Sequence, residues 1–174
     1  MNGLRQQQHS PSVVYRTPNQ EDGPRIWEIV RDSRILDLNS SYFYLTMSRW
    51  FSGSCRVAVN PENGELIGFV IGFREPEHPD TLFVWQIAVD DRYRGKGIAR
   101  NLLDHAAGHP DIRFVEATIS PSNIASRALF ISWAQSRGSS VTLRSCFEKE
   151  CFPGNEHERE DLFRIGPLLR RNLP

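Results

Sequence analysis

Hydrophobic and polar positions change their spacing along the chain, and this predicts an alternation of strands and helices. Short apolar runs bounded by turn residues predict strands, whereas a wider amphipathic spacing predicts helices. Two of the runs flank the turn "NPENGE" and are expected to pair as a hairpin. The expected strands are residues 13–16, 55–60, 66–75, 81–90, 113–119, 141–152 and 160–168.

Amphipathic segments between these strands are expected to form helices. Asp22 is the predicted cap of a helix that begins at Pro24, because proline suits the first helical turn. Ser40 or Ser41 is the expected cap of a second helix, over residues 42–51. Two more helices are expected within residues 97–108, with Ile98, Leu102, Leu103 and Ala106 on one face, and within residues 120–138, with Leu129, Phe130 and Trp133 inward. The order of elements predicts an α/β fold around a sheet of mixed direction.

Composition narrows the classes of function. The 174 residues suit one domain; residues 1–12 are polar and without periodicity, so we expect a disordered tail there and a single domain over residues 13–174. With 21 basic and 21 acidic residues the net charge is zero, which argues against a nucleic-acid partner. The apolar runs are too short to cross a membrane, and the N-terminus lacks a signal-peptide pattern. We therefore expect a cytoplasmic protein with no membrane partner.

The segment "DDRYRGKGIARNLLDHA" (residues 90–106) carries the clearest chemical signal. It departs from the dinucleotide-binding motif, which needs a third glycine at Arg100, and from the Walker loop, which needs a longer glycine spacing. Arg92, Gly95 and Gly97 instead stand where a strand leads into a helix. The free N–H groups of a first helical turn attract anions, and glycines let the main chain approach a phosphate. The motif predicts a pyrophosphate site; the competing interpretation is a solvated connection that binds nothing.

This segment resembles the acyl-coenzyme A motif of the GCN5-related N-acetyltransferases, and "SPSNIASRALF" (residues 120–130) resembles their second characteristic segment. The resemblance implies the fold of that family, a mixed central sheet flanked by helices, and acetyl-CoA as co-substrate. It also implies that the main chain of the strand "QIAV" pairs with the pantetheine arm and that Val89 donates its N–H to the thioester carbonyl. The cofactor-binding residues so implied are Ile87, Ala88, Val89, Arg92, Arg94, Gly95, Lys96, Gly97, Ile98, Ala99, Asn123 and Ser126.

One position departs from the family pattern. Many members carry a tyrosine that protonates the leaving thiolate where this chain has Phe130. A phenyl ring has no proton to donate, so either another group donates or the thiolate leaves unassisted, which its modest pKa allows. A non-catalytic acyl-CoA sensor on the same fold therefore stays open as an alternative.

Further segments narrow the resemblance to the acetyltransferases that convert L-2,4-diaminobutyrate to N4-acetyl-L-2,4-diaminobutyrate on the way to the compatible solute ectoine. They are "LDLNSSYFY", "PDTLFVWQIAVD", "ISPSNIASRALF" and "CFPGNEHEREDLFRIGPL". The resemblance implies a homodimer that transfers the acetyl group directly in a ternary complex. An acetyltransferase for another small diamine or amino acid is the alternative within the class.

A substrate with two ammonium groups and one carboxylate needs a pocket with excess negative charge. The resemblance implies that Asp37, Tyr42, Tyr44, Trp85, Glu158 and Glu160 bind this substrate, and that Glu160, Asp37 or Glu116 accepts the proton of the γ-amine. Glu156 belongs to the same acidic loop as Glu158 and Glu160. Each position also has a structural interpretation: Asp37 as a brace, Trp85 as a core residue, and the acidic loop as a solvated hairpin with His157 on its surface.

Cys146, Cys151 and His157 raise the question of a zinc site. The two cysteines are expected on one strand, and their odd spacing would place them on opposite faces. They are therefore not expected to share a tetrahedral ion, and no metal is expected. A cysteine nucleophile is unsupported as well, because no motif places a base beside it.

Overall fold

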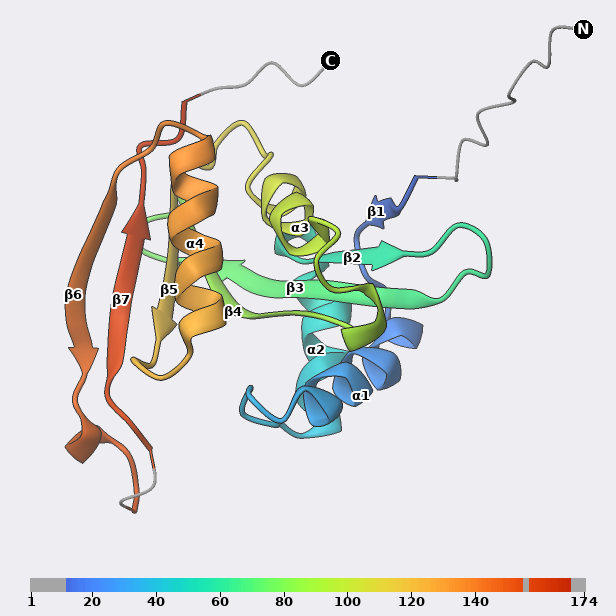
Figure 1. The fold of residues 1–174 in the computed structure, drawn as a ribbon, viewed down its shortest axis with the longest axis horizontal. Helices are drawn as coiled ribbons and strands as arrows, with labels where there is room; N and C mark the ends of the chain where they lie inside the picture. The colour runs from blue at the N-terminus through green and yellow to red at the C-terminus, as the bar shows by residue number, and fades with distance from the viewer. Residues whose placement is uncertain (1–11, 155–156, 170–174) are drawn as a thin grey trace, which may run out of the picture.

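The computed structural model describes residues 12–154 and 157–169, and its centre is a seven-stranded sheet (Figure 1). The strands follow the order β1-β2-β3-β4-β5-β7-β6; β4 and β5 are parallel, and the other neighbouring pairs are antiparallel. Their bounds are β1 Val14–Arg16, β2 Arg56–Val59, β3 Leu66–Arg74, β4 Thr81–Val89, β5 Phe114–Ile119, β6 Val141–Phe147 and β7 Glu160–Ile165. The tail expected at residues 1–12 lies, apart from residue 12, outside the described residues.

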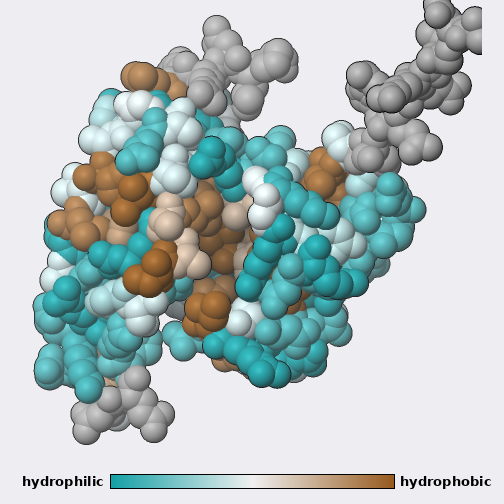
Figure 2. Space-filling view, viewed as in Figure 1, coloured by the Kyte–Doolittle hydropathy of each residue, from teal (hydrophilic) through white to brown (hydrophobic). Residues whose placement is uncertain are grey.

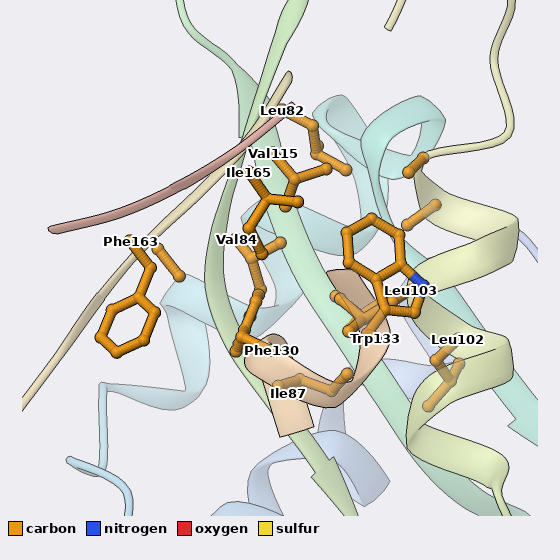
Figure 3. Close-up of a cluster of buried hydrophobic side chains, with 14 of the residues drawn as sticks. Leu82, Val84, Ile87, Leu102, Leu103, Val115, Phe130, Trp133, Phe163 and Ile165 are labelled. Carbon is orange, nitrogen blue, oxygen red and sulfur yellow. The ribbon is translucent and has the colours of Figure 1, made fainter. Parts of the chain in front are cut away.

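Helices cover both faces of the sheet, and each face has its own apolar core. The helices are α1 Gly23–Ser33, α2 Ser41–Trp50, α3 Ile98–Ala106 and α4 Ile124–Ser136. α3 and α4 bury the side chains of one core against β4, β5 and β7, as Figure 3 shows. α1 and α2 cover the other core, around Ile26, Tyr44 and Phe69. The predicted α/β fold with a mixed sheet flanked by helices is confirmed, and within the described residues no helix is long and apolar enough to cross a membrane.

The helix faces expected from the sequence are the buried ones. Ile98, Leu102, Leu103 and Ala106 of α3 are at most 3% exposed. In α4, Phe130 and Trp133 are buried and Leu129 packs against the same core. Trp133 donates its indole N–H to Asp104 of α3 at 2.8 Å, and Arg137 donates to the same carboxylate. These bonds fix α4 beside α3.

Asp22 occupies the expected N-cap position of α1, but its predicted capping role and the predicted end of one strand are wrong. Asp22 makes no side-chain cap for α1, because its carboxylate pairs with Arg16 at 2.7 Å and closes a capping box with Asn19 around a short 3-10 helix, η1 (Gln20–Asp22). The strand expected over residues 141–152 ends at Phe147. Cys151 lies beyond it, in the 3-10 helix η4 (Lys149–Cys151), so the argument that it shares a strand with Cys146 does not hold.

A β-bulge in β4 turns two consecutive side chains to the same face of the sheet. The register with β3 shifts between the pairs Ile71–Gln86 and Gly72–Val84, which leaves Trp85 as an extra residue. Gly72 permits this, because a Cβ there would overlap the carbonyl oxygen of Phe83. As a result Trp85 and Gln86 both face α2, whereas Val84 and Ile87 face the α3–α4 core.

Candidate active site

The parallel strands β4 and β5 separate part-way along their length. They pair from Thr81 to Phe83 against Phe114 to Glu116, whereas β4 continues to Val89. The other edge of β4 stays paired with β3 up to Val89. The second half of β4 therefore has one edge with no described strand beside it.

Main-chain groups of β4 point from this free edge into the gap. Asp90, which follows β4, donates its N–H to the carbonyl of Ile67 at 2.9 Å, so Ile67 and Asp90 form a hydrogen-bonded pair. Hydrogen-bonded and non-hydrogen-bonded pairs alternate in an antiparallel ladder. Ile87 and Val89 therefore direct their N–H and C=O groups away from β3. This is the orientation that the predicted pairing with a pantetheine arm requires.

A cleft of about 470 Å³ lies beside the free edge, and its apolar floor appears in the central hollow of Figure 2. The end of α1 and the following loop close one side through Ser33, Ile35 and Leu36, and α4 closes the other. The cleft brings together most of the cofactor-binding residues expected from the sequence: Ile87, Ala88, Val89, Arg94, Gly95, Gly97, Ile98, Ala99, Asn123 and Ser126.

The glycine-rich loop ends in an open helix N-terminus. After the 3-10 helix η3 (Asp91–Tyr93), Gly95 and Gly97 both adopt φ +76°, a left-handed conformation that favours glycine. Gly97 is the N-cap of α3 and no side chain caps this helix, so the first N–H groups, from Ile98 onward, have no side-chain partner. A Cβ at Gly95 or Gly97 would meet no atom within 4 Å. The loop thus leaves room for a ligand against these amides.

The basic residues of the loop divide into two groups. Arg94 lines the cleft and donates to the carbonyl of Val89 at 3.3 Å. Arg92 does not line it: its guanidinium binds Glu65 and Asp90, and this pairing is the largest cause that lowers the pKa of Asp90 to about 2. Lys96 also lies outside the lining, over the ring of Tyr93. Arg94 is therefore better placed than Arg92 or Lys96 to meet a phosphate.

A second, smaller cavity of about 40 Å³, called the passage below, adjoins the cleft at the gap between β4 and β5. Leu36, Ile87, Asn123 and Ser126 line both spaces. Phe130 also lines the passage, yet its ring is 2% exposed and belongs to the apolar core. On the far side, Trp85, Gln86 and Thr118 line the passage, so it leads from one face of the sheet to the other.

Acidic and basic groups gather at the far mouth of this passage. Asp37, in the loop between α1 and α2, has an 86% exposed side chain that lies 3.3 Å from Nε2 of His157. A hydrogen bond to the Glu158 carbonyl raises the pKa of His157, and the neighbouring Asp37 carboxylate raises it further. The His157 ring stacks on Phe152. Burial raises the pKa of Glu160, which lies close to Thr118 of the passage wall. The structure thus brings together Asp37 and Glu160, two of the expected acids.

The expected aromatic contacts lie in different settings. Trp85 is 47% exposed at the passage and packs against Phe43, so it is not a core residue. Tyr42 is 71% exposed on the first turn of α2. Tyr44 is fully buried, and its hydroxyl is bonded to Gln86 at 3.0 Å. Tyr44 therefore has no exposed surface with which to contact a substrate, and its expected role as a direct contact is not supported.

The remaining expected acids are occupied or outside the described part. Glu116 pairs with Arg164 of the neighbouring β7, so its carboxylate is neutralised within the sheet. Glu158 accepts the main-chain N–H of Ser122 at 3.1 Å, beside the mouth. Glu156 lies outside the described residues. Sequence reasoning missed Leu36 and the side chain of Gln86, because their positions depend on a loop path and a bulge that leave no periodic signal.

The described part of the chain has no group of three or more His, Cys, Asp or Glu side chains arranged to hold a metal ion. Its cysteines Cys55, Cys146 and Cys151 are all free thiols. Burial raises the pKa of the Cys55 thiol to about 11, which keeps it protonated.

The model of the acetyltransferase (GNAT) family matches residues 23–131, from the start of α1 into α4. The chain belongs to this family. The resemblance drawn from the glycine-rich segment and from residues 120–130 is thereby confirmed, and with it the family fold. The matched part of this GNAT domain contains the separated strands, the glycine-rich loop and the cleft.

Relatives of this GNAT domain carry consistent names. The L-2,4-diaminobutyric acid acetyltransferase of Marinococcus halophilus is 48% identical over 162 residues, which cover 91% of this chain and 92% of that protein. The protein of the same name from Streptomyces coelicolor is 46% identical over 155 residues, 87% of this chain and 91% of that protein. A solved structure of diaminobutyrate acetyltransferase EctA from Paenibacillus lautus, in complex with L-2,4-diaminobutyric acid and coenzyme A, has a TM-score of 0.85 and 41% identity, covering 94% and 99% of the two chains.

Proposed function

We propose that this chain transfers the acetyl group of acetyl-CoA to the γ-amino group of L-2,4-diaminobutyrate, producing N4-acetyl-L-2,4-diaminobutyrate. The opening between β4 and β5 carries the proposal, because it joins the cleft beside α3 to the acidic mouth beside Asp37. An acyl donor on one face of the sheet and a cationic amine on the other would meet in this opening. The names of the relatives support diaminobutyrate as the amine.

The cleft suits the acyl donor. Amides at the start of α3 and the guanidinium of Arg94 would hold the pyrophosphate, because both favour anions. The free edge at Ile87 and Val89 offers main-chain groups for the amides of a pantetheine arm, with Asn123 and Ser126 on the opposite wall. When bound there, acetyl-CoA supplies an activated thioester at the narrow passage.

Glu160 is the proposed proton acceptor. The γ-ammonium must lose a proton before its nitrogen can attack a carbonyl carbon. The raised pKa of Glu160 makes it a stronger base than an exposed carboxylate, and it lies close to Thr118 of the passage wall. The N–H of Val89 would donate to the thioester carbonyl oxygen as charge develops there. Glu116 is a weaker candidate because Arg164 occupies it.

Asp37 and its neighbours would select the amine. The α-amine is the easier of the two to deprotonate, so acetylation of the γ-amine requires that the α-amino and carboxylate groups are anchored elsewhere. Asp37 is placed to hold the α-ammonium, and Trp85 and Tyr42 present aromatic surface on the same side. Glu158 adds negative charge at the rim.

The assembly and biological setting are further parts of this proposal. We expect a homodimer in the cytoplasm whose product serves ectoine synthesis and so osmoadaptation. The outer strand β6 supports self-association: it pairs with β7 alone among the described strands, and Leu143 and Phe147 on it are 49% and 47% exposed. Sedimentation velocity tests the dimer, and a concentration-independent monomer contradicts it.

A direct assay tests the function. The purified chain is incubated with acetyl-CoA and a panel of amines while thiol release is followed, and products are assigned by NMR. The proposal predicts that diaminobutyrate has the highest kcat/KM and that the γ-acetyl isomer dominates. Faster turnover of ornithine or a polyamine would support the alternative substrate. Tight acetyl-CoA binding without turnover of any amine would support the acyl-CoA sensor.

A further inference from the structure

A buried hydrogen-bond network lies beneath the acceptor side of the passage. Gln86 of β4 is 6% exposed and Tyr44 of α2 is fully buried. The Tyr44 hydroxyl donates to Oε1 of Gln86 at 3.0 Å, and Nε2 of Gln86 donates to the main-chain carbonyl of Asp37 at 2.6 Å. The main-chain N–H of Asn39 in turn donates to the Tyr44 hydroxyl at 3.3 Å. Both hydrogen-bonding ends of the Gln86 amide are therefore occupied.

The bulge in β4 is the reason that Gln86 reaches this network. Regular alternation along the strand would point Gln86 into the apolar core with Val84. The extra residue, Trp85, reverses this direction and brings Gln86 to the α1–α2 face. A buried amide must be hydrogen-bonded, and the loop above it supplies the partner.

The network holds the loop that presents Asp37. It binds two main-chain groups of this loop, the carbonyl of Asp37 and the N–H of Asn39. The carboxylate of the same Asp37 reaches the other way, to His157 at the mouth. The position of the carboxylate is therefore set from below by Gln86, which itself has no charge to recognise a substrate.

We propose that Gln86 is the positioning residue for amine recognition: through the Asp37 carbonyl it fixes the carboxylate that anchors the diamine, and so decides which amino group enters the passage. The inference rests on the proposed function and deepens it. The bond to the Asp37 carbonyl is short and buried, and its loss leaves that carbonyl without its partner. The loop would then sample other positions, and anchoring of the amine would weaken. The donor cleft would lose only the part of its wall that Ile35 and Leu36 supply, while its walls from α3, α4 and the free edge of β4 stay in place.

Gln86→Met is the first test, because methionine keeps a similar volume and removes both hydrogen-bonding groups. We expect KM for diaminobutyrate to rise about ten-fold, the net effect of one lost buried hydrogen bond. The KM for acetyl-CoA should change much less than the KM for diaminobutyrate, because most of the donor cleft is formed by other elements, and the fraction of α-acetylated product should increase. A purely structural role would instead lower the amount of active enzyme and leave both KM values and the product ratio alone.

A double-mutant cycle tests the route through Asp37. If Gln86 acts through that carboxylate, Gln86→Met should change KM for diaminobutyrate far less in an Asp37→Ala background than in the wild-type background. Equal effects in the two backgrounds would overturn the inference. Tyr44→Phe removes one hydroxyl from the same network and should shift KM and the product ratio in the same direction, which keeps the test available if Gln86→Met does not fold.

Ser48→Ala is the matched control. Ser48 is buried in the same helix as Tyr44, and its hydroxyl has no hydrogen-bond partner within the described residues. This variant should keep the wild-type KM and product ratio. The two failures are distinguishable: a wild-type chain that does not acetylate diaminobutyrate refutes the proposed function, whereas an active wild type with unchanged KM and product ratio in Gln86→Met and Tyr44→Phe refutes the role of Gln86 alone.

Discussion

Gly97→Ala separates the conformational role of the glycine-rich loop from its binding role. Gly97 has φ +76°, and a non-glycine residue in that region costs about 1–2 kcal/mol. A Cβ there would meet no protein atom within 4 Å, so conformational strain is the whole cost to folding. Gly64, in the turn between β2 and β3, has φ +73° and equally open surroundings but does not line the cleft. Gly64→Ala is therefore the matched control.

Both variants should unfold at lower temperature by a similar amount. For a chain of this size, each kcal/mol lowers Tm by about 2–4 °C. Gly97→Ala should in addition raise KM for acetyl-CoA about ten-fold or more, because the new methyl group keeps the pyrophosphate from the amides of α3, and a hydrogen bond to a charged group contributes about 1.5–3 kcal/mol. Gly64→Ala should leave that KM unchanged.

Differential scanning fluorimetry gives Tm, and steady-state kinetics give each KM, with one substrate varied while the other is saturating. The KM for diaminobutyrate serves as an internal control, because the change is on the opposite face of the sheet. Equal KM values for acetyl-CoA in the two variants would refute the assignment of this loop to the pyrophosphate. A lower Tm in Gly97→Ala alone would refute the expectation that both substitutions cause the same conformational strain.

Three further predictions concern charged groups. Burial raises the pKa of Glu160, so its base form is lost as pH falls through that raised pKa, and the pH–rate profile should show an acidic limb there. Glu160→Gln should lower kcat by about 100-fold or more and remove this limb, whereas a limb that remains would belong to another group. Arg94→Ala should raise KM for acetyl-CoA more than Arg92→Ala, which should mainly lower Tm, because it leaves Glu65 and Asp90 with Arg25 as their remaining arginine partner. A larger rise in KM for Arg92→Ala would assign the phosphate contact to Arg92. Asp37→Ala should raise KM for diaminobutyrate and shift the ratio of γ- to α-acetylated product measured by NMR, and constancy of both would exclude Asp37 from recognition.

Periodic features of the chain were predictable because they depend on local geometry. The face of α3 follows from helical spacing, and it is buried as expected. Close approach of the main chain to a ligand was expected from the glycines between a strand and a helix, and the surroundings of Gly95 and Gly97 are open. The place of the cleft follows from the strand–loop–helix order around these glycines.

Features that depend on two distant segments were not predictable. Arg92 and Arg94 are the same residue type in one short loop, so the sequence does not distinguish them. In the structure Arg92 pairs with Glu65 of the β2–β3 connection, whereas Arg94 lines the cleft. The inward direction of Gln86 depends on the register of β4 with β3, and a one-residue shift reverses the face of a side chain. Tyr44 reads as a possible hydroxyl contact in an aromatic helix, and only packing shows that its hydroxyl is used internally.

A crystal structure of the chain with coenzyme A and diaminobutyrate bound together is the most direct test. It should show the pyrophosphate within hydrogen-bonding distance of the amides at the start of α3, and the γ-nitrogen facing the sulfur through the gap between β4 and β5. A pyrophosphate bound away from that helix, or a diamine whose α-nitrogen is the one nearest the sulfur, would contradict the account.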